Sequence, residues 1–266
     1  MKIKVAIAGA RGRMGTTAIE AIEEAVDAEV VAALDYKFDG LHLHNASVNE
    51  VKQGIPIYTS LKKLVEEHQP TVLLDVTDPD AVFNNVKDAL SLGIHPVVGT
   101  SGLTKEELQL ISEMVETTNV GGIIAPNFSV GAVLMMKFAA QASRYLGDVE
   151  ILEMHHDRKL DAPSGTAVKT AEMIMENRPP HIQGHPEEQI HLKGSRGGDV
   201  EGMKIHSIRL PGLLAHQQVL LGGEGELLTI RHDSMSRKSF MPGIMMAIRK
   251  VIGRNDLIYG LENIID

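Results

Sequence analysis

Two hydrophobic patterns alternate along the first half of the chain. One is a short run of Val, Ile, Leu and Ala, typical of a strand buried on both faces, at residues 3–8, 29–34, 71–76, 94–98 and 121–125. The other places apolar residues at helical spacing, at residues 16–26, 61–68, 81–92 and 105–117. This alternation predicts a parallel sheet that is covered by helices on both faces.

The pattern changes after residue 128. A predicted helix at residues 131–146 leads to a strand at residues 149–154, and a second helix begins near residue 164. Three segments then alternate in the manner of antiparallel strands, at residues 204–210, 217–221 and 226–231. A predicted helix at residues 240–252 follows them. The second half therefore predicts a mixed or antiparallel sheet with helices.

A glycine-rich turn follows the first predicted strand and consists of Gly9, Ala10, Arg11, Gly12, Arg13, Met14 and Gly15. Glycines allow a tight turn and a close approach of the backbone to a pyrophosphate, and the next helix offers free N–H groups. Asp35 ends the second strand, 20 residues after Gly15, where a carboxylate can accept hydrogen bonds from an adenosine ribose. The alternative is a turn that only joins a strand to a helix. The strand, helix, second strand and terminal acid together favour dinucleotide binding.

Two later strand ends carry small and polar residues. One is followed by Gly99, Thr100 and Ser101, and the other by Ala125, Pro126, Asn127 and Phe128. Ligands of open α/β sheets bind beyond the carboxyl ends of the strands, so these residues could line a nicotinamide site. Ordinary loop chemistry is the alternative at both places.

Length and composition narrow the class of protein. The 266 residues suit two modest domains, and we predict a Rossmann-like dinucleotide-binding domain at residues 1–126 and 236–266 with an inserted α+β domain at residues 127–235. A net charge of -9 and only 3% aromatic residues argue against a nucleic-acid or anionic-membrane partner. The chain has no Cys, and no apolar run approaches the ~20 residues that cross a bilayer. It opens without a signal-peptide layout, so we expect a cytoplasmic protein.

The most informative stretch gathers positive charge in an otherwise acidic chain. It contains His155, His156, Arg158 and Lys159, followed by Ser164, Gly165 and Thr166 at a predicted helix start. Basic side chains beside the free N–H groups of a helix could trap a carboxylate, and His and Lys suit acid–base chemistry. Adjacent His residues at a strand end rarely chelate one ion, so we expect no metal site. A solvated basic loop is the alternative interpretation.

The same stretch resembles the signature of the dihydrodipicolinate reductase family. Residues 153–167 read E-M-H-H-D-R-K-L-D-A-P-S-G-T-A and match every fixed position of the family pattern E-x-H-H-x-x-K-x-D-A-P-S-G-T-A. Residues 9–15 are similar to the family's G-x-x-G-R-M-G turn, and residues 125–131 contain its N-F-S-V-G stretch. Residues 99–102 are similar to its G-T-T-G, with Ser101 in place of the second Thr. The resemblance spans nearly the whole chain.

This resemblance implies a fold, a reaction and residue roles. It implies a homotetramer whose inserted domain binds substrate and forms the subunit contacts. It also implies reduction by NADH or NADPH of a cyclic hydroxylated imine dicarboxylate to tetrahydrodipicolinate with loss of water, a step of lysine biosynthesis. By motif position, His155 would be the acid–base residue and Lys159 the proton donor. A substrate carboxylate would be held by His156, Ser164, Gly165 and Thr166, and the cofactor by the glycine turn, Asp35 and the two strand ends.

Two other functions remain open, together with the choice of cofactor. Another NAD(P)-dependent imine or amino-acid dehydrogenase could share the glycine turn without the His-His-x-x-Lys and Ser-Gly-Thr pairing. A nucleotide-sensing regulatory protein would bind NAD(H) and tolerate the loss of Lys159. Asp35 favours tolerance of NADH, whereas Lys37 could meet the 2′-phosphate of NADPH or stay solvated.

Overall fold

The computed structural model describes the chain except for residues 1, 44–53, 181 and 266. The chain folds into two compact units. Unit 1 comprises Met1–Ser129 and Phe240–Asp266, and unit 2 comprises Val130–Ser239. Unit 2 is therefore inserted between two segments of unit 1.

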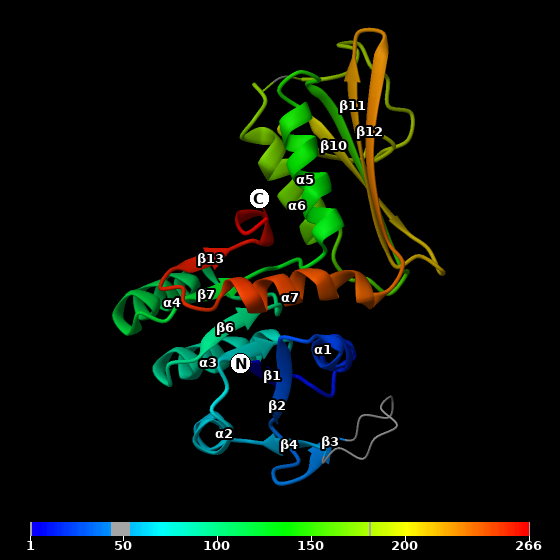
Figure 1. Ribbon diagram of the computed structural model, residues 1–266. Coiled ribbons are helices and arrows are strands. Elements are labelled where there is room, and N and C mark those ends of the chain that lie inside the picture. The colour runs from blue at the N-terminus through cyan, green and yellow to red at the C-terminus, as the bar shows by residue number, and fades with distance from the viewer. Residues whose placement is uncertain (1, 44–53, 181, 266) are drawn as a thin grey trace. The chain divides into compact units, whose positions relative to one another are not determined.

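Among the described residues, unit 1 is built on an eight-stranded sheet in the order β13-β7-β6-β5-β1-β2-β4-β3 (Figure 1). Its strands are β1 (Ile3–Ala8), β2 (Ala28–Leu34), β3 (His42–Leu43), β4 (Ile55–Tyr58), β5 (Val72–Asp75), β6 (His95–Val98), β7 (Gly122–Ile124) and β13 (Leu257–Tyr259). Neighbouring strands are parallel except β3 and β4, which are antiparallel. The chain adds strands outward from β1 on one side and from β5 on the other. The strand order therefore reverses between β1 and β5.

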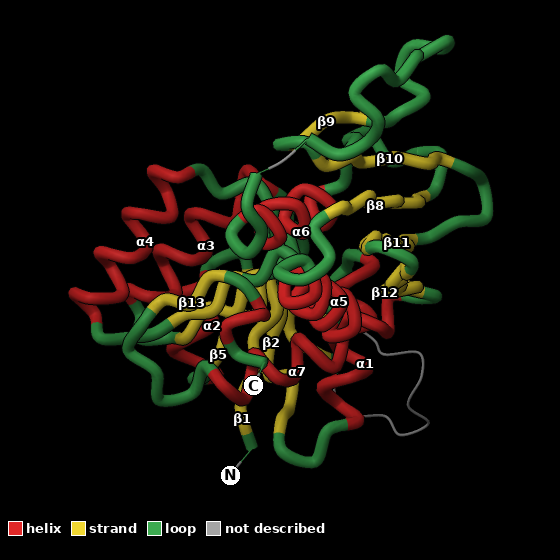
Figure 2. The backbone as a smooth tube through the Cα atoms, turned by 90° about the horizontal axis from the view of Figure 1, so that it is seen from above, coloured by secondary structure: helices red, strands yellow, loops and turns green. Residues whose placement is uncertain are grey.

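Helices cover both faces of this sheet (Figure 2). They are α1 (Arg13–Glu24), α2 (Leu61–His68), α3 (Pro79–Ser91), α4 (Lys105–Thr118) and α7 (Met241–Lys250), with a short 3-10 helix at Leu261–Asn263. Helices α2, α3 and α4 pack in series, and α1 packs against α7. Right-handed β-α-β connections place α1 and α3 on opposite faces, because the chain leaves the centre of the sheet in opposite directions. The central strands are thereby sealed, and every residue of β5 is fully buried.

In the described part of unit 2, a five-stranded sheet has the order β12-β11-β8-β10-β9. Its strands are β8 (Asp148–His155), β9 (Gly198–Val200), β10 (Met203–Arg209), β11 (Ala215–Gly223) and β12 (Glu226–Ser234). Helices α5 (Val130–Ala142) and α6 (Gly165–Met175) cover one face, and a 3-10 helix at Arg237–Phe240 lies where the chain passes from unit 2 back into unit 1. Alternate residues of β8 are buried beneath these helices, and the residues between them are only partly covered. One face of this sheet thus carries helices, and the side chains of the other, called the open face below, are only partly covered.

The predicted Rossmann-like sheet with a second sheet unit is confirmed. Four strands were not predicted from the sequence, namely β3, β4, β9 and β13. Each has four residues or fewer, too short to show a period, and Pro56 interrupts β4. The pattern of β10 suggested an antiparallel strand, but β10 pairs in parallel with β8 and is antiparallel only to β9.

Candidate active site

The glycine turn joins β1 to α1 at the centre of the unit 1 sheet. Gly9 has a φ of +82°, and a Cβ atom there would lie 2.6 Å from the carbonyl oxygen of Val76. A Cβ atom on Gly15 would collide with the carbonyl oxygen of Gly9. Gly12 precedes α1 without a side-chain cap, so no capping side chain uses the first N–H groups of that helix. The turn requires glycine and offers backbone donors to an anion.

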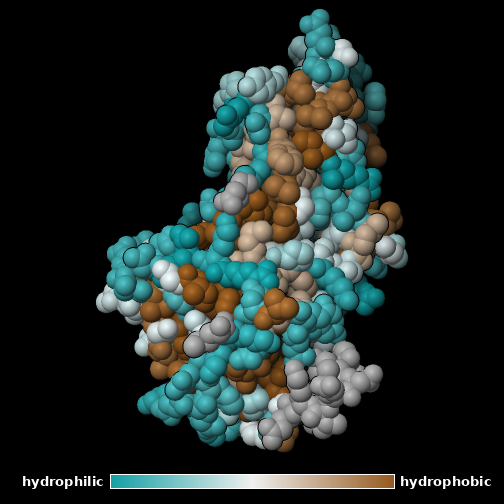
Figure 3. Space-filling model, in the orientation of Figure 1, coloured by the Kyte–Doolittle hydropathy of each residue, from teal (hydrophilic) through white to brown (hydrophobic). Residues whose placement is uncertain are grey.

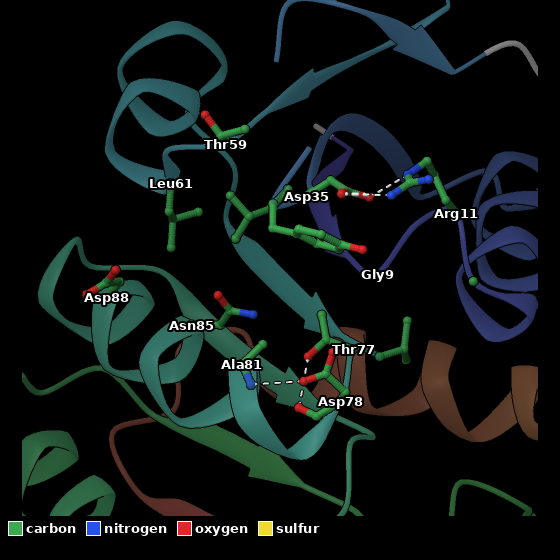
Figure 4. A pocket seen from close by; sticks show the side chains of 14 residues that line it. Gly9, Arg11, Asp35, Thr59, Leu61, Thr77, Asp78, Ala81, Asn85 and Asp88 are labelled. Atoms are coloured by element: carbon green, nitrogen blue, oxygen red, sulfur yellow. Dashed lines mark hydrogen bonds and ion pairs between the residues drawn. The ribbon is translucent and has the colours of Figure 1, made fainter. Parts of the chain in front are cut away.

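A first cavity of about 440 Å³ lies where the strand order of unit 1 reverses (Figure 4). Four of the predicted cofactor residues line it, namely Gly9, Arg11, Gly12 and Asp35. Thr77 and Asn85 belong to its opposite side, which is formed by the residues after β5 and by α3. Open α/β sheets bind nucleotides at such a reversal of strand order.

Arg11 and Asp35 form a two-pronged ion pair on one side of the first cavity. Arg11 Nε lies 2.6 Å from Asp35 Oδ2, and Arg11 Nη2 lies 3.0 Å from Asp35 Oδ1. The guanidinium also lies 4.5 Å from the centre of the Phe38 ring. Partial burial opposes ionisation of Asp35, but hydrogen bonds from Arg11 and the Lys37 amide, with the charge of Arg11, hold its pKa below the usual value. The carboxylate is thus kept ionised as an acceptor.

A second cavity of about 320 Å³ lies beyond β6 and β7 in the same unit. The predicted residues that line it are Met14, Gly99, Thr100, Ser101, Pro126, Asn127 and Phe128. A Cβ atom on Gly99 would lie 2.9 Å from the Phe128 ring, so glycine is needed for this ring to close the wall. Val76 and Thr77 line both cavities, which makes them neighbours along one binding surface.

Three predicted cofactor residues line neither cavity. Ala10 and Ala125 are buried in the core, and Arg13 is exposed on the first turn of α1. Val76 and Thr77, which line both cavities, were not among the predicted cofactor residues. A signal for them was present, because polar residues follow the buried run at residues 71–76 in the same way as at the other strand ends.

In unit 2, the end of β8 carries His155 beside a buried carboxylate. His155 Nδ1 lies 2.6 Å from Glu153 Oε2. Arg209 of β10 donates to both oxygens of Glu153, over 2.8 Å and 2.7 Å, and the Ser164 amide donates to Glu153 Oε1 over 3.2 Å. Glu153 therefore ties the His155 ring, the neighbouring strand and the start of α6 together. With Nδ1 engaged, Nε2 is the imidazole nitrogen left for proton exchange.

The environment of Glu153 stabilises its charge. Burial of this fully covered side chain opposes ionisation, but hydrogen bonds from His155, Arg209 and Ser207 outweigh it and lower its pKa to about 2. A paired and fully hydrogen-bonded carboxylate is the form in which a buried charge is tolerated. Glu153 is part of the sequence motif at residues 153–167, but no role was predicted for it.

The segment after β8 holds Lys159 in an ion pair. Lys159 Nζ lies 2.6 Å and 2.8 Å from the two carboxylate oxygens of Asp161. The Lys159 amide donates to the His156 carbonyl, and Arg209 donates to the Asp161 carbonyl over 2.8 Å. These contacts anchor the basic segment to the strand that carries Arg209.

The start of α6 follows the basic segment. Ser164 is buried, and its hydroxyl accepts the Ala167 amide over 3.2 Å, which makes it the helix cap. A Cβ atom on Gly165 would meet nothing within 4 Å, so the backbone there is open to a ligand. His156 and Gly165 are exposed, and Thr166 is half-buried.

No group of three or more His, Asp or Glu side chains in the described part of the chain could hold a metal ion. None of its helices is both long enough and apolar enough to cross a membrane.

Two models of one known protein family together match nearly the whole chain. The model described as dihydrodipicolinate reductase, N-terminus, matches residues 3–128, and the corresponding C-terminus model matches residues 131–265. The chain is 54% identical over 265 residues to 4-hydroxy-tetrahydrodipicolinate reductase of Lysinibacillus sphaericus, covering 100% of both chains. It is 52% identical to the protein of that name from Halalkalibacterium halodurans, covering 99% of this chain and 100% of the relative.

Solved structures give the same grouping. Dipicolinate-bound dihydrodipicolinate reductase from Paenisporosarcina sp. TG-14 matches with a TM-score of 0.89 and 50% identity, over 100% of both chains. Amine dehydrogenase from Mycobacterium smegmatis matches with a TM-score of 0.70 but 9% identity, over 98% of this chain and 96% of that one. The likeness to the amine dehydrogenase is therefore one of fold alone.

Proposed function

Because the chain belongs to the dihydrodipicolinate reductase family, we propose that it reduces 4-hydroxy-tetrahydrodipicolinate to tetrahydrodipicolinate with NADH or NADPH, in diaminopimelate and lysine biosynthesis. The substrate gains a hydride from the cofactor and a proton, and its hydroxyl group leaves as water. The observation that carries this function is the full-length match, at 54% and 52% identity, to proteins named for the reaction. The intact basic segment at residues 153–167 supports it. The protein is an NAD(P)H-dependent oxidoreductase, and neither a different dehydrogenase nor a nucleotide sensor is favoured.

The function is tested by supplying the unstable substrate in place. The preceding synthase makes it from pyruvate and aspartate semialdehyde, and oxidation of NADH or NADPH is followed optically. We expect rapid oxidation only in the complete mixture, with tetrahydrodipicolinate as the product. A folded protein that binds the cofactor yet oxidises neither NADH nor NADPH in this mixture would overturn the assignment.

The two cavities of unit 1 fit the two ends of the cofactor. The first cavity, beside the glycine turn and Asp35, suits the pyrophosphate and adenosine, because backbone N–H groups and a ribose acceptor meet there. The second cavity, lined by Thr100, Asn127 and Phe128, suits the nicotinamide and its carboxamide. When bound, the cofactor supplies the hydride of the reaction.

The Arg11–Asp35 pair suits the use of both cofactors. Asp35 can accept the ribose hydroxyls of NADH, and Arg11 can bind the 2′-phosphate of NADPH with its fork of donors. NADH would thus engage Asp35, and NADPH would engage Arg11. In either case the two side chains remain neighbours of opposite charge. We infer that the enzyme accepts NADH and NADPH rather than excluding one of them.

The basic segment of unit 2 supplies the protons. Lys159 is proposed as the proton donor to the reduced ring, and its ion pair with Asp161 holds the side chain in place. His155 is proposed as the acid–base residue, with Glu153 fixing the ring so that Nε2 exchanges the proton. Donors of this kind lower the barrier by neutralising negative charge that develops on the ring nitrogen side during reduction.

The start of α6 is proposed as the carboxylate site. The relative from Paenisporosarcina binds dipicolinate, a cyclic dicarboxylate. In this chain, Gly165 and Thr166 present the first amides of α6 and His156 adds an exposed imidazole, which together can hold one carboxylate. Ser164 would contribute through the cap that fixes this helix start.

The open face of the unit 2 sheet suits a homotetramer. Odd-numbered residues of β8 face α6, as Gln217 of β11 does through its 2.7 Å hydrogen bond to Thr170. Even-numbered residues, including Leu152 and Met154, face the other way and remain partly exposed. Figure 3 shows apolar side chains among polar ones on the visible surface of unit 2. On the open sheet face, Leu227 of β12 is 65% exposed. Such a surface is typical of a subunit interface, which supports assembly through this face.

A further inference from the structure

Asp75 carries a fully buried carboxyl group, and no role has been assigned to it so far. It is the last residue of β5, next to β1 at the centre of the unit 1 sheet, and its exposure is 0%. A polar side chain in such a place costs free energy unless hydrogen bonds replace its lost water. The hydrogen-bond partners of Asp75 therefore indicate its role.

Four hydrogen bonds converge on this carboxyl group. Asp75 Oδ1 accepts the Thr77 amide over 3.1 Å, the Thr77 hydroxyl over 2.7 Å and the Thr100 hydroxyl over 2.6 Å. Asp75 Oδ2 accepts Asn85 Nδ2 over 2.8 Å. The donors come from the loop after β5, from α3 and from the loop after β6. One side chain therefore joins three segments that the sheet alone would not hold in fixed relation.

The donors belong to the walls of the two cofactor cavities. Asn85 lines the first cavity, Thr100 lines the second, and Thr77 lines both. In Figure 4, Thr77 and Asn85 lie on the same side of the first cavity, across from Arg11 and Asp35. Asp75 is thus a shared support beneath the region where the two cavities meet.

The direction of these hydrogen bonds also determines whether the hydroxyl groups in the cavity walls can donate or accept hydrogen bonds from a ligand. A threonine hydroxyl has one proton and two lone pairs. Because Thr77 and Thr100 each donate that proton to Asp75, their oxygens can only accept hydrogen bonds from a ligand. An acceptor in the second cavity is complementary to the NH₂ group of a carboxamide.

We propose that Asp75 is a positioning residue for the cofactor, which fixes the Thr77 and Asn85 wall of the first cavity and makes Thr100 an acceptor in the second. The proposal rests on the assignment of both cavities to the cofactor. Asp75 acts through its hydrogen-bond partners and does not touch the reacting atoms.

The test compares Asp75→Asn with Thr100→Val and Thr100→Ser by ligand binding and by kinetics. ADP-ribose reports the first cavity, and the emission of bound NADH reports the surroundings of the nicotinamide. We expect Asp75→Asn to weaken the binding of ADP-ribose, alter the NADH emission and lower kcat about tenfold, the scale of one lost hydrogen bond. Thr100→Val should change emission and kcat but leave ADP-ribose affinity unchanged, and Thr100→Ser should restore both.

A double variant distinguishes positioning from simple loss of stability. If Asp75 acts through Thr100, adding Asp75→Asn to Thr100→Val should lower kcat by much less than the product of the single effects. Tyr58→Phe is the matched control, because it removes a buried hydroxyl that contacts Glu67 and His68 and lines neither cavity. It should lower Tm without changing NADH emission.

Two results would overturn the proposal. One is Asp75→Asn lowering Tm as Tyr58→Phe does while NADH emission and ADP-ribose affinity stay at wild-type values. The other is wild-type emission in Thr100→Val, which remains measurable if Asp75→Asn fails to fold. Both readouts are made without substrate, so they stand even if the wild-type protein proves not to reduce the proposed dicarboxylate.

Discussion

Replacing Glu153 with Gln keeps the shape of a buried side chain and removes its charge. The pKa of Glu153 is held at about 2 against a usual 4.5, so its contribution to stability is complete above pH 4.5 and is lost as the pH falls toward 2. We expect Glu153→Gln to lower the free energy of unfolding at pH 7 by on the order of 3 kcal/mol. Urea unfolding of both proteins at pH 7 and pH 3 measures this. A deficit of equal size at both pH values would contradict the argument.

Arg11 and Asp35 allow a matched pair of variants for cofactor preference. Arg11→Met removes the donors proposed for the 2′-phosphate, and Asp35→Asn removes the charge proposed to accept the ribose hydroxyls of NADH. We expect Arg11→Met to lower kcat/KM for NADPH about tenfold with a smaller loss for NADH, and Asp35→Asn to do the reverse. Equal losses for both cofactors in both variants would show that the pair is structural only.

For single residues, the sequence allowed us to predict where a particular residue type is required, but not which distant residue it would contact. The glycine turn was predictable because Gly9 and Gly15 have local reasons to be glycine, as their φ angle and close contacts show. The role of Glu153 was not, because its partner Arg209 is 56 residues away and comes close only through the pairing of β8 and β10. The same holds for Asp75 and Thr100, which are 25 residues apart.

At the scale of elements, α6 and α4 offer a comparison of two helix caps. Ser164 caps α6 at the proposed carboxylate site, and Thr104 caps α4 in unit 1 with a reciprocal contact from Glu107. We expect Ser164→Ala and Thr104→Ala each to cost about 1 kcal/mol of stability. Only Ser164→Ala should also raise KM for the dicarboxylate, since only that cap orders amides that bind it. An equal effect of the two variants on KM would remove this role from the start of α6.

Helices and strands were predictable where they were long enough to show a hydrophobic period. The predicted bounds of β1 and α2 agree with the structure at both ends. The predicted first helix begins at residue 16, whereas α1 begins at Arg13, because Gly12 caps it without a recognisable side chain. The direction of β10 depends on which strand lies beside it, and no pattern within its seven residues carries that information.

At the scale of the whole molecule, the open sheet face of unit 2 makes assembly testable. Leu227→Lys places a charge on this face, and Leu110→Lys places one on α4, where the leucine is 49% exposed in unit 1. We expect light scattering to show a tetramer for the wild type and for Leu110→Lys, and smaller species for Leu227→Lys, because burying an unpaired charge opposes association. A tetramer that survives Leu227→Lys unchanged would place the subunit contacts elsewhere.

An isotope label can follow the hydride from the cofactor to the product. The enzyme is given cofactor that carries deuterium at the transferable position, with substrate made in place by the synthase, and the product is analysed by mass spectrometry. We predict one deuterium in each tetrahydrodipicolinate formed by the wild type, and turnover lower by ~10²-fold or more in Lys159→Ala, the scale of a lost acid–base group. Cofactor oxidation without deuterium in the product, or wild-type turnover in Lys159→Ala, would contradict the account.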